Sequence, residues 1–256
     1  MRKNAVLAAW RDGKQTVGSW LGIGNAFTAE LMANLGFDWL CIDMQHGLIG
    51  YSDLKAMLPA LSTTDVTPLV RVAWNEPSLI MRALDAGAYG VIVPMINNRE
   101  EALKAVAACY YPPLGIRSYG PIRAALYAGS DYASQANREI ACVAMIETAE
   151  GLDNLEEIVS TPGIDGVYIG PSDLSLALGQ QPIGDSSDSE HGVWIEKIRK
   201  ACVKQGVAAG IHTSSLEYTL KYLAQGFNFV NLGTDSSFMA KAALSDLKAA
   251  RLNQDS

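Results

Sequence analysis

The sequence lacks any long uninterrupted hydrophobic run. No stretch reaches the roughly 18 apolar residues that a membrane-spanning helix requires, and the apolar stretch at residues 5–10 is ended by the charged residues Arg11 and Asp12. That stretch is also too short for the hydrophobic region of a secretory signal peptide. We therefore expect no membrane partner and a cytoplasmic location.

Paired cysteine motifs are also missing. The four cysteines, at positions 41, 109, 142 and 202, lie far apart and form no C-x-x-C pair. Buried thiols behave as small hydrophobic groups, and disulfides are rare in cytosolic proteins. We expect four reduced cysteines in the core.

Clustered positive charge is a third absence. The formal net charge is −7, and the 20 Lys and Arg residues are scattered along the chain. A nucleic-acid partner needs basic residues grouped against its phosphates, so we expect a small-molecule ligand and no nucleic acid. The 256 residues and 49% hydrophobic content allow one large core, and such a length fits two small domains or one α/β barrel.

Short apolar runs alternate with longer amphipathic runs along the whole chain. Strands are predicted at residues 17–23, 39–43, 68–73, 90–94, 141–147, 166–170, 207–212 and 229–233. Helices are predicted at residues 28–35, 52–61, 78–86, 99–109, 154–160, 193–205, 215–224 and 237–250. Continuous apolar strands are typical of parallel strands covered on both faces. The pattern favours an α/β fold, a single (β/α)₈ TIM barrel over residues 1–256, rather than an open doubly wound sheet.

Capping signals and two irregular segments complete this pattern. The predicted helix N-caps are Thr28, Ser52, Ser172 and Ser215. The predicted helix-ending glycines are Gly36, Gly87, Gly206 and Gly226. A long connection at 110–137 is expected to be functional or to cover something, because loops of that length are uncommon. The polar segment 180–191 is expected to be a surface excursion, in preference to a metal site built from Asp185, Asp188, Glu190 and His191.

Polar side chains follow several predicted strands at the point where each strand ends. Asp43, Arg71, Glu147 and Asp173 occupy such positions, and in a (β/α)₈ barrel the C-terminal strand ends meet at one mouth, where active sites are built. Glu147 and Asp173 are a candidate metal pair, because two carboxylates in a partly dry site repel each other unless a divalent cation joins them. The alternative is that Glu147 caps the next segment and Asp173 only begins a helix.

Arg71 and His46 are the other candidate catalytic residues. A buried arginine needs a partner, which is either an internal salt bridge or a substrate carboxylate and enolate oxygen held by the planar guanidinium. His46 follows the strand that carries Asp43, and His212 is its rival because it also ends a strand. A catalytic imidazole needs an orienting carboxylate, and Asp85 supplies one only if the end of its helix reaches the mouth.

Residues Gly170, Pro171 and Ser172 lead into a helix. Free backbone N–H groups at a helix N-terminus bind anions, so a substrate carboxylate is expected to rest there. All ten lysines occupy helical or polar stretches and none ends a predicted strand. This excludes a Schiff-base aldolase, which needs a lysine in the site.

A set of short motifs points to a known family. They are DMQHG at 43–47, LVRV at 69–72, AGAYGVIVP at 86–94, YPPLGIR at 111–117, IET at 146–148 and GVYIGPSD at 166–173. This set resembles the HpcH/HpaI family of class II, metal-dependent pyruvate aldolases, which includes 4-hydroxy-2-oxoheptanedioate and 2-keto-3-deoxy sugar acid aldolases. The resemblance extends over residues 17–235, and the IGPSD and PPLGIR motifs are fairly specific.

The resemblance implies a role for each matching residue. Glu147 and Asp173 would hold Mg²⁺, Mn²⁺ or Co²⁺, and Arg71 would bind pyruvate and stabilise its enolate. His46, oriented by Asp85, would be the acid–base group, which settles the choice against His212. Trp20 and Asp43 would line the aldehyde side. The resemblance also implies a homo-oligomer, a hexamer or trimer, in which the 117–127 loop reaches a neighbouring active site.

Two positions depart from the family pattern. Gln45 stands where many members have Glu before the histidine, and Met145 stands where many have Gln before Ile-Glu. Both lie near the predicted metal, so they affect how it is tuned and which aldehyde is preferred.

The expected reaction is the reversible cleavage of a 4-hydroxy-2-keto acid to pyruvate and an aldehyde through a metal-stabilised enolate. One alternative is an acyl-CoA lyase of the citrate lyase β type, which needs a basic groove for the coenzyme A phosphates. Another is a catalytically silent barrel that binds a keto acid. The absence of a Lys/Arg cluster disfavours the first, and exchange of pyruvate methyl protons separates an enzyme from the second.

Overall fold

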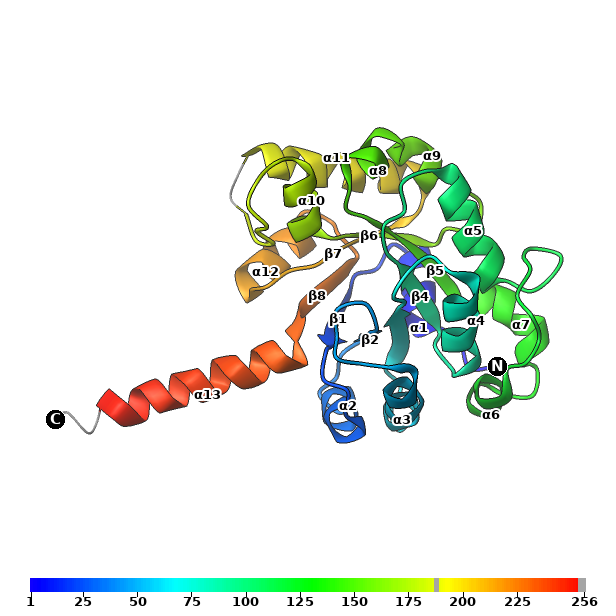
Figure 1. The fold of residues 1–256 in the computed structure, drawn as a ribbon, viewed down its shortest axis with the longest axis horizontal. Coiled ribbons are helices and arrows are strands. Elements are labelled where there is room, and N and C mark those ends of the chain that lie inside the picture. The colour runs from blue at the N-terminus through cyan, green and yellow to red at the C-terminus, as the bar shows by residue number, and fades with distance from the viewer. Residues whose placement is uncertain (187–188, 253–256) are drawn as a thin grey trace.

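A closed barrel of eight parallel strands forms the centre of the molecule in the computed structural model, which describes residues 1–186 and 189–252 (Figure 1). The strands are β1 Thr16–Leu21, β2 Trp39–Asp43, β3 Thr67–Arg71, β4 Gly90–Val93, β5 Ala141–Ile146, β6 Gly166–Ile169, β7 Ala208–Ile211 and β8 Phe229–Thr234. They follow chain order, and β8 pairs with β1 to close the barrel. The predicted (β/α)₈ fold is confirmed, and each predicted strand is found with small differences at its ends.

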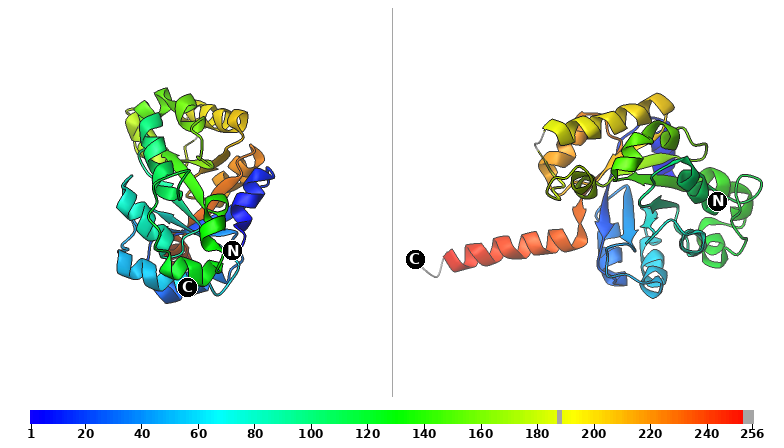
Figure 2. Two further views of the ribbon diagram at one scale, coloured as in Figure 1. Left: turned by 90° about the vertical axis from the view of Figure 1, so that its right-hand side faces the viewer. Right: turned by 45° about the horizontal axis from the view of Figure 1, so that its top comes forward.

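Helices alternate with the strands and surround the barrel (Figures 1 and 2). They are α1 Ala5–Arg11, α2 Ala26–Ala33, α3 Tyr51–Leu61, α4 Pro77–Asp85, α5 Arg99–Cys109, α6 Ile122–Ala128, α7 Tyr132–Glu139, α8 Ala149–Asp153, α9 Leu155–Val159, α10 Pro171–Ala177, α11 Ser189–Gln205, α12 Leu216–Ala224 and α13 Asp235–Leu252. Among the described residues, no helix has the length and hydropathy needed to cross a membrane.

The segment 110–137 was predicted as a long connection between elements. It is not irregular throughout, because it contains α6 and the start of α7. The helix α1 was also not predicted. Its apolar face carries Val6, Leu7 and Trp10 into the interior of the barrel, where the Trp10 ring lies 4.5 Å from that of Phe229. This contact closes the end of the barrel where the strands begin.

Of the predicted N-caps, only Ser215 is confirmed, with its hydroxyl accepting the Tyr218 N–H. The helix α2 is capped by Asn25, and α3 and α10 begin after Gly50 and Gly170. An Asn side chain accepts hydrogen bonds from the first N–H groups of a helix as well as Ser or Thr does. Because Asn25 comes earlier in the chain, α2 begins there and Thr28 lies inside the helix. The helix-ending glycines are confirmed by positive φ angles at Gly36, Gly87, Gly206 and Gly226.

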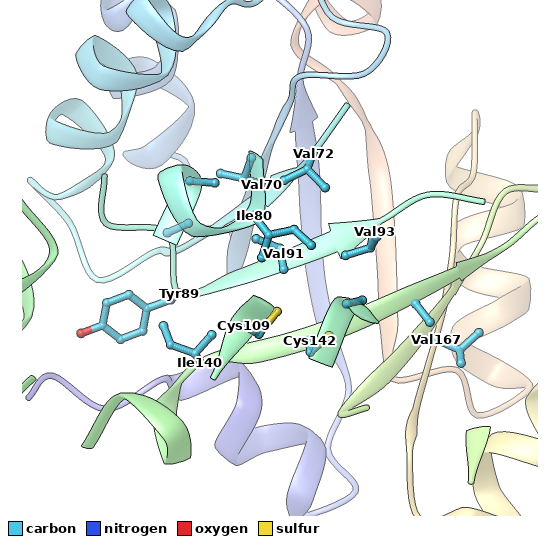
Figure 3. Close-up of a cluster of buried hydrophobic side chains, with 14 of the residues drawn as sticks. Val70, Val72, Ile80, Tyr89, Val91, Val93, Cys109, Ile140, Cys142 and Val167 are labelled. Atoms are coloured by element: carbon cyan, nitrogen blue, oxygen red, sulfur yellow. The ribbon is translucent and has the colours of Figure 1, made fainter. Parts of the chain in front are cut away.

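Two layers of apolar side chains hold the barrel together. One layer lies between strands and helices; Figure 3 shows Val70, Val91, Val93 and Val167 of the strands in this layer, with Ile80 and Cys109 from the helices. The second fills the barrel itself and includes Trp39, Tyr168 and Phe229. All four cysteines are buried and free, as expected for core thiols.

The segment 180–191 is only partly an excursion, because α11 already begins at Ser189. Its Asp185 carboxylate accepts hydrogen bonds from the Ser214 N–H at 3.1 Å and the Ser215 hydroxyl at 2.7 Å. The ring of His191 is buried, with Nε2 3.2 Å from the Pro171 carbonyl. Asp188 lies outside the described residues, and the part of the chain that is described holds no cluster of three metal-ligating side chains.

The helix α13 extends away from the barrel instead of covering it (Figures 1 and 2). Residues 239–251 are all exposed, including Met239, Leu244 and Leu247. The helix α2 also leaves apolar side chains, Phe27 and Leu31, exposed on its outer face.

The close packing of Gly18 against Trp39 is expected to be essential for the barrel. A Cβ at position 18 would overlap the Trp39 ring, which is fully buried, and overpacking a core costs about 1–3 kcal/mol or more. We expect Gly18→Ala to lower the urea midpoint of unfolding. The control is Gly192→Ala in α11, where no atom lies within 4 Å; it is expected to stabilise by up to about 1 kcal/mol. Equal midpoints for the two variants would contradict this assignment.

Candidate active site

The ends of β1, β2 and β3 bring three of the predicted site residues together inside the barrel mouth. Asp43 and Arg71 are register partners at the ends of β2 and β3, and Trp20 lies near the end of β1. Parallel strands in register end at the same level, so side chains distant in the chain meet there. Asp43 and Arg71 are both 8% exposed and Trp20 is buried.

Asp43 and Arg71 form a two-pronged ion pair. Arg71 Nε donates to Asp43 Oδ1 at 2.9 Å, and Nη2 donates to Oδ2 at 2.6 Å. Asp43 Oδ1 also accepts the backbone N–H groups of Gln45 and His46. Burial alone would raise the pKa of Asp43, but its hydrogen bonds and the Arg71 charge outweigh burial and hold this pKa below its usual value. The internal salt bridge considered for Arg71 therefore exists, and it positions the start of the loop that carries His46.

One end of the Arg71 guanidinium remains without an oxygen partner. Its Nη1 lies 3.9 Å from the Met145 sulfur, which is a weak acceptor. The Cζ atom lies 4.6 Å over the Trp20 ring, a cation–π contact that fixes the plane of the group. This geometry leaves a positive donor beside β5 that can bind a ligand oxygen.

Glu147 lies buried directly after β5. Its Oε1 accepts the Met95 backbone N–H at 2.9 Å, and Met95 has a φ of 56°, which is uncommon for a residue other than glycine. Burial raises the pKa of Glu147 and the nearby Asp173 carboxylate adds to this shift, whereas the Met95 N–H and Arg71 oppose it, so that the resulting pKa is about 7. Glu147 and Asp173 thus interact, although they follow different strands.

Gly170, the N-cap of α10, gives Glu147 the space that it needs. A Cβ at position 170 would lie 2.5 Å from Glu147 Oε2 and 2.7 Å from the Met145 methyl carbon. Only glycine fits this close approach. Asp173 lies exposed in the first turn of α10, with Ser172 half-buried before it.

A pocket of about 490 Å³ opens at the mouth of the barrel beside Trp20, Asp43 and Arg71, and its lining does not include Glu147 or Asp173. This mouth pocket is lined by Trp20, Gly22, Ile23, Gly24, Asp43, His46, Gly47, Leu48, Arg71, His212, Thr234 and Ser236. The size is that of a site for a small molecule. His46 lies exposed in its wall, at the start of the β2–α3 loop.

Asp85 is not brought to His46 within one chain. It ends α4, and its Oδ1 accepts a hydrogen bond from Arg117 Nη2 at 2.7 Å, inside a cluster with Tyr132. Asp85 lines a separate groove of about 440 Å³ on the outside of the barrel, with Arg82 and Arg123. A pairing of Asp85 with His46 therefore needs a second copy of the chain.

Sequence reasoning missed several residues that shape the site. Met95 gives no sequence signal, because its role depends on a φ angle and not on its side chain. Tyr168 lies in an apolar run, yet its hydroxyl accepts the Trp20 Nε1–H at 2.9 Å and holds the indole in place. Gln45 has a buried Oε1 without a hydrogen-bond partner among the described residues.

The closed parallel barrel, with polar side chains at the C-terminal rim, places the molecule in the (β/α)₈ class. The chain belongs to the HpcH/HpaI aldolase/citrate lyase family, whose model matches residues 16–242. It is 41% identical to the hydroxypyruvate/pyruvate aldolase of Rhizorhabdus wittichii over 97% of this chain and 99% of that protein.

Two further similarities agree with this membership. The 2-dehydro-3,6-dideoxy-6-sulfogluconate aldolase of Pseudomonas putida is 39% identical over 89% of each chain. The solved structure of an HpcH/HpaI aldolase/citrate lyase family protein from Burkholderia cenocepacia superposes with a TM-score of 0.92 at 32% identity, covering 97% of this chain and all of that one. The aldolase relatives make this chain a carbon–carbon lyase.

The raised pKa of Glu147 predicts an unusual pH dependence of stability without metal. Between its ordinary pKa near 4.5 and its folded value of about 7, the unfolded chain loses a proton that the folded chain keeps. Stability should therefore fall by about 3 kcal/mol as pH rises through this window. Urea unfolding in EDTA at a series of pH values measures it. Glu147→Gln removes this component, so identical pH profiles for variant and wild type would contradict it.

Proposed function

We propose that this chain, as one domain over residues 1–256, cleaves a 4-hydroxy-2-keto acid reversibly to pyruvate and an aldehyde. The observation that carries the proposal is the buried Glu147 carboxylate, which interacts with Asp173 while Arg71 Nη1 reaches the Met145 sulfur on β5, the strand that leads to Glu147. Relatives that share 39–41% of the sequence are named as aldolases of pyruvate-type and sugar-acid substrates, which supports the same chemistry here.

The donor set at Glu147 and Asp173 fits a divalent cation, Mg²⁺, Mn²⁺ or Co²⁺. Two carboxylates supply hard oxygen ligands, which these ions prefer, and burial of Glu147 raises its pKa more than the Met95 N–H and Arg71 lower it. Gly170 has no side chain that would collide with Oε2, because a Cβ there would lie 2.5 Å from this oxygen. When bound, the cation supplies Lewis-acid polarisation of the C2 carbonyl of the keto acid.

The remaining residues bind the substrate and move its protons. The substrate carboxylate lies against the backbone at Gly170, Pro171 and Ser172. Arg71 Nη1, whose nearest partner is the Met145 sulfur, binds the C2 oxygen, while Asp43 and Trp20 keep the guanidinium in place and line the aldehyde side. The orientation of Arg71 is therefore set before substrate arrives.

His46 is the acid–base group in this proposal. It removes the proton from the C4 hydroxyl, the C3–C4 bond breaks, and its electron pair forms the enolate of pyruvate while an aldehyde leaves. Arg71 stabilises the charge that develops on the C2 oxygen. Proton delivery to C3 completes pyruvate, and the reverse sequence joins pyruvate to an aldehyde.

Asp85 orients His46 from a neighbouring copy of the chain in this proposal. Asp85 Oδ1 is held by Arg117, whereas Oδ2 lies 3.9 Å from the place of a Cβ on Gly120 and faces the outer groove. Through its Oδ2 atom, Asp85 of the partner subunit can accept a hydrogen bond from the second N–H of the His46 imidazole. The site is then complete only in a homo-oligomer.

The exposed helix α13 supports a homo-oligomeric state, a hexamer or trimer. Helices in proteins gain most of their stability from packing of an apolar face, and Met239, Leu244 and Leu247 stay uncovered along α13. The exposed Phe27 and Leu31 of α2, the helix between β1 and β2, offer an apolar surface. We infer that α13 packs on another copy of the chain.

The acyl-CoA lyase alternative lacks a binding surface for coenzyme A at the mouth. Among the described residues that line the mouth pocket, Arg71 is the one Lys or Arg side chain, and Asp43 already neutralises it. Phosphate groups need several cationic or N–H donors. This favours a substrate without phosphates.

Exchange of the pyruvate methyl protons for deuterium tests the proposed chemistry. We expect metal-dependent exchange that EDTA abolishes, and at least about a 100-fold loss of rate in Glu147→Ala and in Arg71→Ala, because each removes charge stabilisation of the enolate. The matched control is Glu150→Ala, which removes an exposed carboxylate close in the chain. Folded Glu147→Ala or Arg71→Ala protein with wild-type exchange and cleavage rates would refute the assignment, and a silent keto-acid binder would show no exchange at all.

The role of α13 is tested by replacing its apolar side chains. We expect Leu244→Glu combined with Leu247→Glu to dissociate the assembly, because buried charge without a partner is costly. Light scattering coupled to gel filtration gives the mass. Val203→Glu on α11, which changes an equally exposed apolar residue, is expected to leave the mass unchanged. A wild-type monomer, or an α13 variant of unchanged mass, would rule out this interface.

A further inference from the structure

The turn that follows β4 controls how Glu147 is held. Met95 lies just beyond the end of β4, and its N–H donates to Glu147 Oε1 at 2.9 Å while its φ is 56°. A residue other than glycine is uncommon in this region of φ, and it stays there only where the surrounding contacts hold it. The groups that hold the Met95 turn therefore also place the donor to Glu147.

Asn97 is hydrogen-bonded through all four of its polar groups. Its Nδ2 donates to the Met95 carbonyl at 2.9 Å, and its Oδ1 accepts a hydrogen bond from the Thr148 hydroxyl. Its backbone N–H donates to Glu101 Oε2 at 2.7 Å, and its carbonyl accepts from Asn154 Nδ2 at 2.9 Å. Asn97 is half-buried, so these bonds are partly shielded from water and hold the residue in one position.

The orientation of the Asn97 amide follows from its partners. The Met95 carbonyl can only accept, so Nδ2 must face it. The Thr148 hydroxyl accepts the Gly151 N–H at 2.9 Å as the N-cap of α8, which leaves its proton for Asn97 Oδ1. The amide therefore links the Met95 turn to Thr148, the residue that directly follows Glu147.

Backbone contacts bring the same two loops together around this link. The Ile96 N–H donates to the Met145 carbonyl at 3.2 Å, and a Cβ on Gly151 would lie 2.9 Å from the Ile96 carbonyl oxygen. The β4–α5 and β5–α8 loops are thus in direct contact beside the buried carboxylate of Glu147.

We propose that Asn97 is a positioning residue for the carboxylate that binds the cation. It clamps the Met95 turn so that the Met95 N–H fixes Glu147 Oε1. The second oxygen, Oε2, then faces Gly170 at the start of α10, the helix that carries Asp173. This inference rests on the proposed function, in which Glu147 and Asp173 hold the cation. Groups that orient a metal ligand contribute roughly 10–100-fold to metal affinity, because a ligand that is already in place loses little freedom on binding.

Binding of Mn²⁺ in the absence of substrate tests this role. We expect Asn97→Ala to raise the Kd for Mn²⁺ by roughly 10–100-fold, as measured by titration calorimetry. The matched control is Asn98→Ala, because Asn98 caps α5 by accepting the Glu101 N–H at 3.0 Å and donates to Glu150. Both substitutions remove local hydrogen bonds and are expected to lower the melting temperature, but Asn98→Ala should leave the Kd unchanged. Thermal unfolding checks that each variant is folded.

The outcomes separate this inference from the proposed function, with Glu147→Ala as the reference for lost binding. If wild type and Glu147→Ala bind Mn²⁺ equally weakly, the proposed function and this inference both fail. If Glu147→Ala loses binding while Asn97→Ala keeps the wild-type Kd, the positioning role alone fails. It also fails if Asn98→Ala raises the Kd as much as Asn97→Ala does.

Substitution of Thr148 tests whether it acts with Asn97 through one hydrogen bond. Thr148→Ser keeps the hydroxyl and is expected to keep the Kd for Mn²⁺ close to that of wild type, whereas Thr148→Val removes the hydroxyl and is expected to raise the Kd. Because Thr148→Val and Asn97→Ala break the same link, their combination should raise the Kd no further than the larger single effect. Effects that multiply in the double variant, or equal Kd values for Thr148→Ser and Thr148→Val, would refute the link.

Discussion

The charge of Glu147 is the constraint on which the rest of the site depends. A carboxylate is placed inside a largely apolar barrel, close to a second carboxylate at the start of α10, and burial pushes its pKa to about 7. Two features accommodate it there: the Met95 backbone, which has a positive φ and donates to it, and the missing side chain at Gly170. Backbone strain and close glycine contacts are costs that folds retain at functional sites.

The ion pair of Asp43 and Arg71 is the second organising interaction. It satisfies a buried arginine through two strong hydrogen bonds, and it uses only one side of the guanidinium. Arg71 also stacks on Trp20, and Asp43 also accepts from the His46 N–H, so a single pair connects three strands with the loop that carries the imidazole. Removing either partner would leave an uncompensated charge in the barrel.

Two features of the single chain bear on its assembly. Asp85 and His46 line different pockets, and α13 leaves its barrel with apolar side chains exposed. Both features have the same physical explanation if copies of the chain pack together. An exposed apolar helix gains stability when it is buried. The resulting contact would bring side chains of one copy close to the barrel mouth of another. Formation of the assembly would then also complete the active site.

Local sequence patterns were sufficient for the strands. Buried parallel strands are continuous apolar runs, so each of the eight could be recognised without its neighbours, and glycines such as Gly36 and Gly87 marked helix ends because they alone adopt positive φ readily. Glu147, Asp173 and Arg71 were recognisable as candidates because a polar residue at the end of an apolar strand is unusual. The local pattern left the pairing of His46 with Asp85 open, and the family resemblance alone favoured it.

Tertiary structure alone decided how these residues act. That Asp43 neutralises Arg71 depends on the register of β2 against β3, which closure of the barrel sets and which no local propensity contains. The pKa of Glu147, the φ of Met95, the hydrogen bond between Asn97 and Thr148 and the separation of Asp85 from His46 all depend on distances between segments far apart in the chain. The sequence determined which chemical groups are present and on which elements they lie, whereas burial and proximity, which control their charge and reach, exist only once the barrel has closed.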